Sequence, residues 1–200
     1  DGLNRFDGLS FRVFKREETN LGNNFITALY EDAKGNIWIG TDAGVYIYDP
    51  LQEKFAAFDL KSDRGSSVKH AITLISGDEK GNIWISADSD GLFCYDPHRG
   101  KLFNYLNNPF RGNVTRFWFE GKSCWAALYA DNLYCVDKGF TSPMVPFRNA
   151  EGEELFKNDI INTQVEGPHN CIYVGSFNGL TEINLTTRKT RRLLNAYVRS

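Results

Sequence analysis

The sequence predicts an all-β protein: a fragment of an antiparallel β-propeller, with four near-complete four-stranded blades and half a blade at the N-terminus. Three observations predict this class. A motif recurs at the interval of a propeller blade, the expected strands are apolar on both faces, and aromatic residues are abundant, with fifteen Phe, nine Tyr and four Trp against one Met. Large flat side chains of this kind pack well between sheets.

The recurring motif sets the repeat length. Gly35–Gly40 (GNIWIG) returns as Gly81–Ser86 (GNIWIS), and weaker copies surround Trp125 and Tyr173. Aromatic anchors at Trp38, Trp84, Trp125 and Tyr173 are separated by 46, 41 and 48 residues. A repeat of about 40 to 45 residues is typical of a four-stranded propeller blade.

Each repeat divides into four short strands joined by turn residues. In the clearest copy we expect strands near Phe25–Tyr30, Asn36–Gly40, Val45–Tyr48 and Lys54–Phe58. The segment Gly2–Asp7 fits the third strand of the same pattern, so the two strands before it are expected upstream in the native protein. The sequence thus predicts one partial propeller domain over residues 1–200. Its half blade spans 1–15, and its blades span approximately 23–60, 69–107, 113–148 and 158–198.

The polarity of the strands favours stacked sheets. In Ile37, Trp38 and Ile39 the side chains alternate in direction, yet both directions are apolar. A sheet with one solvated face would alternate apolar and polar residues instead. The fourth strands, Lys54–Phe58 and Arg188–Leu194, are more polar, as expected for the outer rim of a blade.

Composition excludes several classes of function. The net charge of -2 predicts no nucleic-acid partner, and no run of apolar residues approaches the roughly 20 needed for a membrane-spanning helix. The four cysteines lack a C-x-x-C spacing and the three histidines are scattered, so we expect no metal site and no cofactor. Cys94 and Cys135 fall at the position of Ile47, which predicts small core residues and no disulfide.

Residues 26–50 carry the pattern Ile-x-x-Leu-x-x-Asp-x-x-Gly-Asn-Ile-Trp-Ile-Gly-Thr-x-x-Gly-Val-Tyr-x-Tyr-Asp-Pro almost completely, and residues 72–97 nearly so. This pattern resembles the two-component regulator propeller repeat. The resemblance implies a seven-bladed propeller in the periplasmic sensor region of a hybrid two-component system. It further implies a carbohydrate fragment as the signal, and a histidine kinase elsewhere in the same chain. No catalytic activity is expected in these 200 residues.

The motif residues Asp32, Gly35, Asn36, Trp38 and Asp49 are best interpreted as structural, because each recurs in step with a turn or an inter-blade contact. Binding residues are expected among those that differ between repeats, near the loops at one end of the blades. Sugars are held by aromatic faces and by planar polar groups that bond to hydroxyls. On that chemistry the candidate ligand-binding residues are Asp42, His70, Asp90, Arg116, Tyr129 and Phe177.

Two other functions remain open from the sequence. A propeller of this kind could serve as a protein-interaction scaffold, and propellers also host glycosidases and lyases. The acidic loop residues Asp42, Asp90 and Asp131 leave the enzyme alternative open, although none lies in a recognisable catalytic motif. The expected partners are an oligosaccharide and the rest of the sensor and kinase. A homodimer or self-association is also expected, because blade faces left open would expose apolar residues.

Overall fold

The computed structural model describes residues 2–88, 90–106, 114–120, 123–137 and 144–195. These residues form eighteen strands and no helix. The strands are β1 (Leu3–Phe6), β2 (Phe11–Phe14), β3 (Ile26–Glu31), β4 (Ile37–Thr41), β5 (Gly44–Asp49), β6 (Lys54–Ala57), β7 (Ile72–Gly77), β8 (Ile83–Ala87), β9 (Gly91–Asp96), β10 (Lys101–Leu106), β11 (Val114–Glu120), β12 (Ser123–Leu128), β13 (Leu133–Asp137), β14 (Val145–Pro146), β15 (Ile161–Gly167), β16 (Cys171–Ser176), β17 (Gly179–Asn184) and β18 (Thr190–Asn195).

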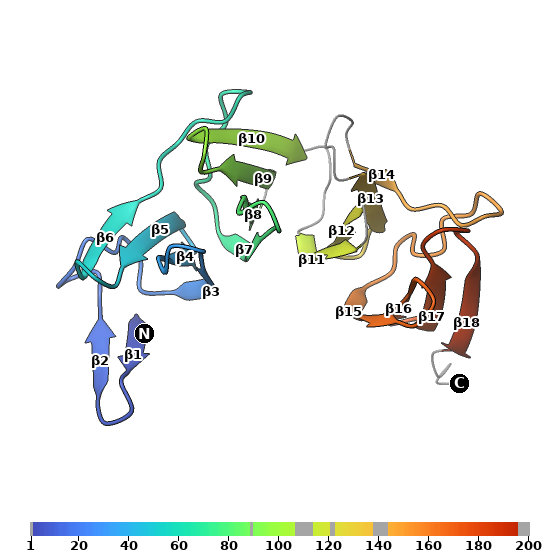
Figure 1. Cartoon of the computed structure of the whole chain (residues 1–200), viewed down its shortest axis with the longest axis horizontal. Helices are drawn as coiled ribbons and strands as arrows, with labels where there is room; N and C mark the ends of the chain where they lie inside the picture. The colour runs from blue at the N-terminus through green and yellow to red at the C-terminus, as the bar shows by residue number, and fades with distance from the viewer. Residues whose placement is uncertain (1, 89, 107–113, 121–122, 138–143, 196–200) are drawn as a thin grey trace. The chain divides into compact units, whose positions relative to one another are not determined.

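The strands form four four-stranded sheets and one hairpin, all antiparallel. Within each sheet the strands pair in chain order, as β3-β4-β5-β6, β7-β8-β9-β10, β11-β12-β13-β14 and β15-β16-β17-β18, while β1 pairs with β2. Figure 1 shows this meander in every sheet. The predicted all-β class, with four four-stranded blades and a two-stranded half blade, is confirmed.

The chain divides into two compact units, Asp1–Asn113 and Val114–Ser200. The first unit contains the β1–β2 hairpin and the sheets β3–β6 and β7–β10, and in it β7 packs against β3 and β4. The second unit contains the sheets β11–β14 and β15–β18, where β15 packs against β11. Successive sheets within each unit therefore meet through their first strands.

The strand register confirms the equivalence of the repeats. Trp38 lies opposite Ile47, Trp84 opposite Cys94 and Trp125 opposite Cys135. Both cysteines are buried at the position of Ile47, as the repeat predicts for small core residues. Burial raises the pKa of Cys94 far above its ordinary value.

Aromatic side chains of the fourth strands join one sheet to the next. Phe58, just after β6, packs on Trp38 of its own sheet with ring centroids 5.0 Å apart, and on Tyr95 of the following sheet at 5.1 Å. Phe14 of β2 makes the contact equivalent to that between Phe58 and Tyr95. It packs on Tyr48 of the following sheet, with ring centroids 5.3 Å apart. Aromatic rings therefore fill both sheet boundaries of the first unit, which accounts for part of the aromatic content of the chain.

Each four-stranded sheet has a β-bulge near the start of its first strand. The register shifts between Ile26 and Ala28, and again at the equivalent places in β7, β11 and β15. The extra residue is polar in every case: Thr27, Thr73, Thr115 and Asn162. A bulge bends a strand and increases its twist. The recurring bulges thus curve the first strands close to the loops that connect second and third strands.

Candidate functional site

The aspartate of the Asp-x-x-Gly-Asn motif organises the turn between first and second strands. The Oδ1 atom of Asp32 accepts hydrogen bonds from the backbone amides of Lys34 and Asn36 at 2.9 and 3.0 Å. Its Oδ2 atom accepts from Asn36 Nδ2 at 3.1 Å and from the indole N–H of Trp38 at 2.9 Å. Asp78 accepts the same four hydrogen bonds in the next repeat, including the one from the indole N–H of Trp84.

Burial acts to raise the pKa of Asp32, but hydrogen bonds from Trp38, Asn36 and Lys34 outweigh it and the pKa is lowered. The carboxylate therefore serves as the acceptor that a buried tryptophan N–H requires. The sequence of the third repeat lacks the Asp-x-x-Gly-Asn motif, and the indole N–H of its buried Trp125 has no hydrogen-bond partner among the described residues.

The aspartate at the end of each third strand has a similar structural role. The Oδ1 atom of Asp49 accepts from the amides of Leu51 and Gln52 at 2.8 and 3.0 Å. The same turn is built on Asp7, Asp96 and Asn184. Such residues cap turns by bonding to amides two and three positions on. The geometry supports a structural role for the motif residues.

Two of the predicted ligand-binding residues meet in the first unit. The Nδ1 atom of His70 lies 2.7 Å from Oδ1 of Asp90, although the residues are 20 positions apart. The Oδ2 atom of Asp90 accepts from the backbone amides of Lys69 and His70 at 3.0 and 3.1 Å. The Asp90 side chain is 15% exposed, whereas that of His70 is 64% exposed. Asp90 thus fixes the chain entering β7, and the imidazole projects into solvent.

Asp42 lies at the same end of the first unit. It is exposed in the β4–β5 turn, where the hydroxyl of Thr41 donates to the Gly44 carbonyl at 2.9 Å. A side-chain carbon on Gly44 would lie 3.1 Å from the carbonyl oxygen of Val68. The turn that carries Asp42 is therefore packed against the segment that leads to His70.

The other three predicted residues belong to the second unit. Tyr129 and Phe177 are 56% and 64% exposed in the loops after β12 and β16. The Phe177 loop is tied to the segment before β15 by a bond from its amide to the Ile160 carbonyl at 3.0 Å. Arg116 lies on strand β11 itself, next to the bulge and opposite Ala127, and is exposed.

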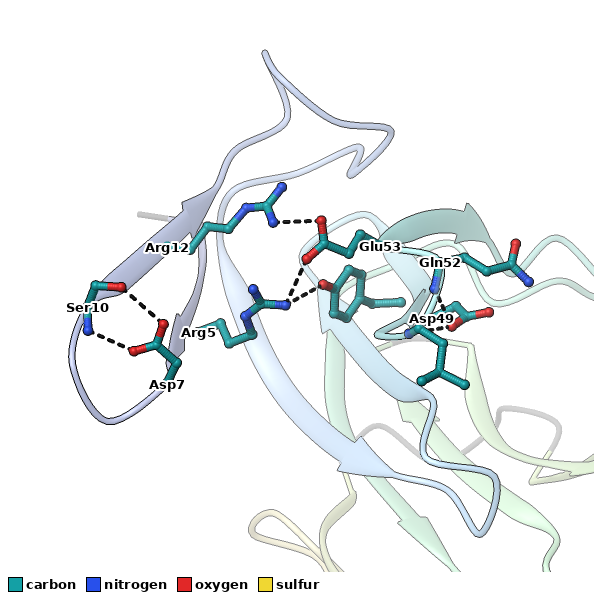
Figure 2. A network of polar contacts seen from close by, with 9 residues as sticks. Arg5, Asp7, Ser10, Arg12, Asp49, Gln52 and Glu53 are labelled. Atoms are coloured by element: carbon teal, nitrogen blue, oxygen red, sulfur yellow. Dashed lines mark hydrogen bonds and ion pairs between the residues drawn. The ribbon is translucent and has the colours of Figure 1, made fainter.

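A further group of polar residues joins the hairpin to the neighbouring sheet and was not predicted (Figure 2). The Nη1 atoms of Arg5 and Arg12 donate to the two oxygens of Glu53, at 3.1 and 2.7 Å. Arg5 also donates to the Tyr48 hydroxyl at 3.3 Å. Hydrogen bonds from Arg12 and Arg5 lower the pKa of Glu53.

These residues break the repeat, and that is the signal that could have revealed them. Arg5 stands where the later repeats have Ile47 and Cys94, and Glu53 stands where the next repeat has Gly100. Glu53 also has a φ of 52°, close to the 62° of Gly100. A non-glycine residue in this left-handed conformation is uncommon.

The described parts of the chain contain no group of three His, Cys, Asp or Glu residues arranged to hold a metal ion. The same parts contain no helix that is both long and apolar enough to cross a membrane.

Successive four-stranded antiparallel meanders that repeat every 41 to 48 residues and pack through their first strands are blades of a β-propeller. Residues 20–43 match the model of the two component regulator propeller. No curated protein compared with the chain matches it.

Three solved structures illustrate the similarity of fold. The extracellular domain of a putative hybrid two component system from B. thetaiotaomicron superposes with a TM-score of 0.69 at 21% identity, covering 92% of this chain and 26% of that one. The extracellular domain of a putative one component system from the same organism gives 0.61 at 18% identity, covering 97% and 34%. The β-propeller domain of Cps50 (Swd1) from Myceliophteria thermophila gives 0.59 at 20% identity, covering 86% and 56%. This chain therefore spans about a quarter to a third of the two bacterial domains.

Proposed function

We propose that the chain is part of the ligand-sensing propeller of a hybrid two-component regulator, and that it binds a carbohydrate fragment. The observation that carries the proposal is the match of residues 20–43 to the two component regulator propeller. The similar domains from B. thetaiotaomicron are extracellular, which supports a location of this segment outside the cytoplasm, in the periplasm. The partner for signalling is a histidine kinase in the same polypeptide.

The His70–Asp90 pair supports a carbohydrate as ligand. A carboxylate only accepts hydrogen bonds, so the contact requires the proton on Nδ1 of His70. In a neutral ring this leaves Nε2 as an acceptor, held in orientation by Asp90 and exposed to solvent. An oriented acceptor on an exposed ring suits a sugar hydroxyl, which donates one hydrogen bond.

The second unit offers exposed aromatic residues of its own that suit sugar recognition. Tyr129 and Phe177 present large apolar surfaces at loops that differ between repeats. Such rings stack on the C–H faces of sugars.

Binding transmits a signal only if the ligand has a higher affinity for one conformational state than for another.

The glycosidase alternative is weakened by the bonding of two of its three candidate carboxylates, Asp90 and Asp131. Both oxygens of Asp90 accept hydrogen bonds from Lys69 and His70. One oxygen of Asp131 accepts from the Tyr134 hydroxyl at 2.9 Å. A glycosidase requires two carboxyl groups that face one bond of the substrate, and these groups already serve the turns around them.

The proposal is tested by calorimetric titration of oligosaccharides into the protein and into a His70→Ala variant. The expected result is binding of one glycan class without release of smaller sugars. His70→Ala should weaken this binding at least about fivefold, because it removes one hydrogen bond that contributes about 1 kcal/mol. His98→Ala is the matched control, because His98 is also exposed and lies in the β9–β10 turn. Equal affinity in all three proteins would refute a role for His70, and sugar release would establish an enzyme.

A further inference from the structure

An open cleft of about 380 Å³ lies at the rim of the first unit, between β2 and the start of β6. Its base is formed by Phe14 and Phe55, whose rings meet edge to face at 5.4 Å and are almost fully buried. Ligand pockets commonly span about 300 to 1,000 Å³. The cleft is therefore large enough for one ring-sized molecule.

One wall of the cleft is held in place before any ligand arrives. Arg12 is fixed by its bond to Glu53 and by the Phe14 ring, whose centroid lies 4.8 Å from the guanidinium carbon. Glu53 is held in turn by Arg5 on the neighbouring strand (Figure 2). A guanidinium carries five N–H donors, and the structure uses one of Arg12's on Glu53. The remaining donors of Arg12 are available to an anion.

Of the other polar side chains that line the cleft, the Thr19 hydroxyl is bonded to the backbone of Lys15 and Leu21, and three others have no partner among the described residues. Lys54, Glu18 and Asn20 line it. Across the described residues, the side chains of these three make no hydrogen bond or ion pair. Polar groups gathered around one cleft and left without protein partners are suited to bind a ligand.

The balance of charge defines the ligand. Among the residues that line the cleft, Arg12 and Lys54 are positive and Glu18 and Glu53 are negative. Arg12 is paired with Glu53, which leaves the Lys54 ammonium and the Glu18 carboxylate unpaired. A single carboxylate can pair with the Lys54 ammonium and accept hydrogen bonds from the free donors of Arg12, whereas Glu18 repels a multiply charged anion such as phosphate and instead accepts hydrogen bonds from hydroxyls. We propose that the cleft binds a ring-sized hydroxy acid, a sugar that carries one carboxylate. The carboxylate would lie between Arg12 and Lys54, and the hydroxyls would face Glu18 and Asn20.

The site is particular to this sheet boundary and is not a property of the repeat. At the next boundary Ala56 stands in the position of Arg12, and Gly100 stands in the position of Glu53. Lys101 retains the position of Lys54, opposite the third-strand aspartate in both sheets. Of the two boundaries in the first unit, the first therefore combines the lysine with the fixed arginine and the second does not.

The proposal is tested by NMR titration of the protein with D-glucuronate, D-glucose and acetate. The expected result is that glucuronate shifts the amide signals of residues 18–20 and 53–55, and binds at least about tenfold more tightly than glucose, which has the same ring without the charge. Lys54→Gln should weaken glucuronate binding about threefold, as expected for a solvent-exposed charge pair. Lys101→Gln is the matched control and should leave the affinity unchanged.

Four outcomes would overturn the proposal. Equal binding of glucose and glucuronate would show that the charge is not recognised, and equal binding of acetate would show that the hydroxyls are not. Binding of glycine that is abolished by Glu18→Gln would assign the cleft to an amino acid. Because the cleft and the His70–Asp90 pair have separate amide signals, shifts confined to residues 70 and 90 would reject the cleft while leaving carbohydrate sensing intact.

Discussion

Replacement of Asp32 by alanine tests the central structural element of the repeat. The substitution removes four hydrogen bonds to one carboxylate, including the bond from the buried indole of Trp38. A hydrogen bond to a charged group contributes about 1.5 to 3 kcal/mol, and a buried donor left unsatisfied costs about 1 to 3 kcal/mol. The amides of Lys34 and Asn36 regain water, because this turn is exposed to half-buried. We therefore expect Asp32→Ala to lower the free energy of unfolding by about 2 to 4 kcal/mol.

The assay is guanidinium unfolding followed by tryptophan fluorescence, with two companion variants. Asp32→Asn keeps the shape but places an NH₂ group against the donors of Asn36 and Trp38, so it should recover less than half of the loss. Asp59→Asn is the control, because Asp59 is exposed and makes no side-chain bond within the described residues. Surface changes of that kind stay within about 0.5 kcal/mol. A loss for Asp32→Ala no greater than that of Asp59→Asn would refute the assigned role.

Three further predictions follow from packing and charge. Phe58→Ala should lower the free energy of unfolding by about 3 to 5 kcal/mol, because Phe58 packs between Trp38 and Tyr95. Denaturant titration measures this loss, with Leu51→Ala as the control because Leu51 is exposed. Gly77→Ala should cost about 1 to 3 kcal/mol in the same assay, because its new methyl would overlap the Tyr30 hydroxyl. The pKa of Glu53 is lowered from 4.5, so its stabilising effect is fully present above pH 4.5 and lost as the pH falls through the folded pKa. Glu53→Gln should remove that part of the pH dependence, as measured by thermal unfolding between pH 3 and pH 7; an unchanged profile would refute the assignment.

Repetition made the strands predictable from the sequence. The strands expected near Phe25–Tyr30 and Asn36–Gly40 are found as β3 and β4 within one residue at each end. The turn residues are also accounted for, because a carboxylate followed by Gly and Asn has few stable conformations. The equivalence of Cys94 with Ile47 followed from the same frame and is confirmed by the register.

Departures from the repeat mark individual residues in the sequence, but they do not show which residues contact one another. The pairing of His70 with Asp90 depends on how the segment before β7 folds back over the β8–β9 loop, and no local pattern encodes that approach. Arg116 lies on strand β11 itself, next to the bulge after Val114. The Glu53 cluster depends on two arginines that the repeat does not contain.

The central claim is that this propeller segment senses a carbohydrate without transforming it. Calorimetric titration of the protein with a panel of oligosaccharides, followed by chromatography of the titrated sugars, tests it most directly. The account predicts saturable binding of one glycan class, recovered intact, with affinity reduced by His70→Ala and unchanged by His98→Ala. Recovery of cleaved sugar, or no binding of any glycan alongside capture of a defined protein partner, would contradict it.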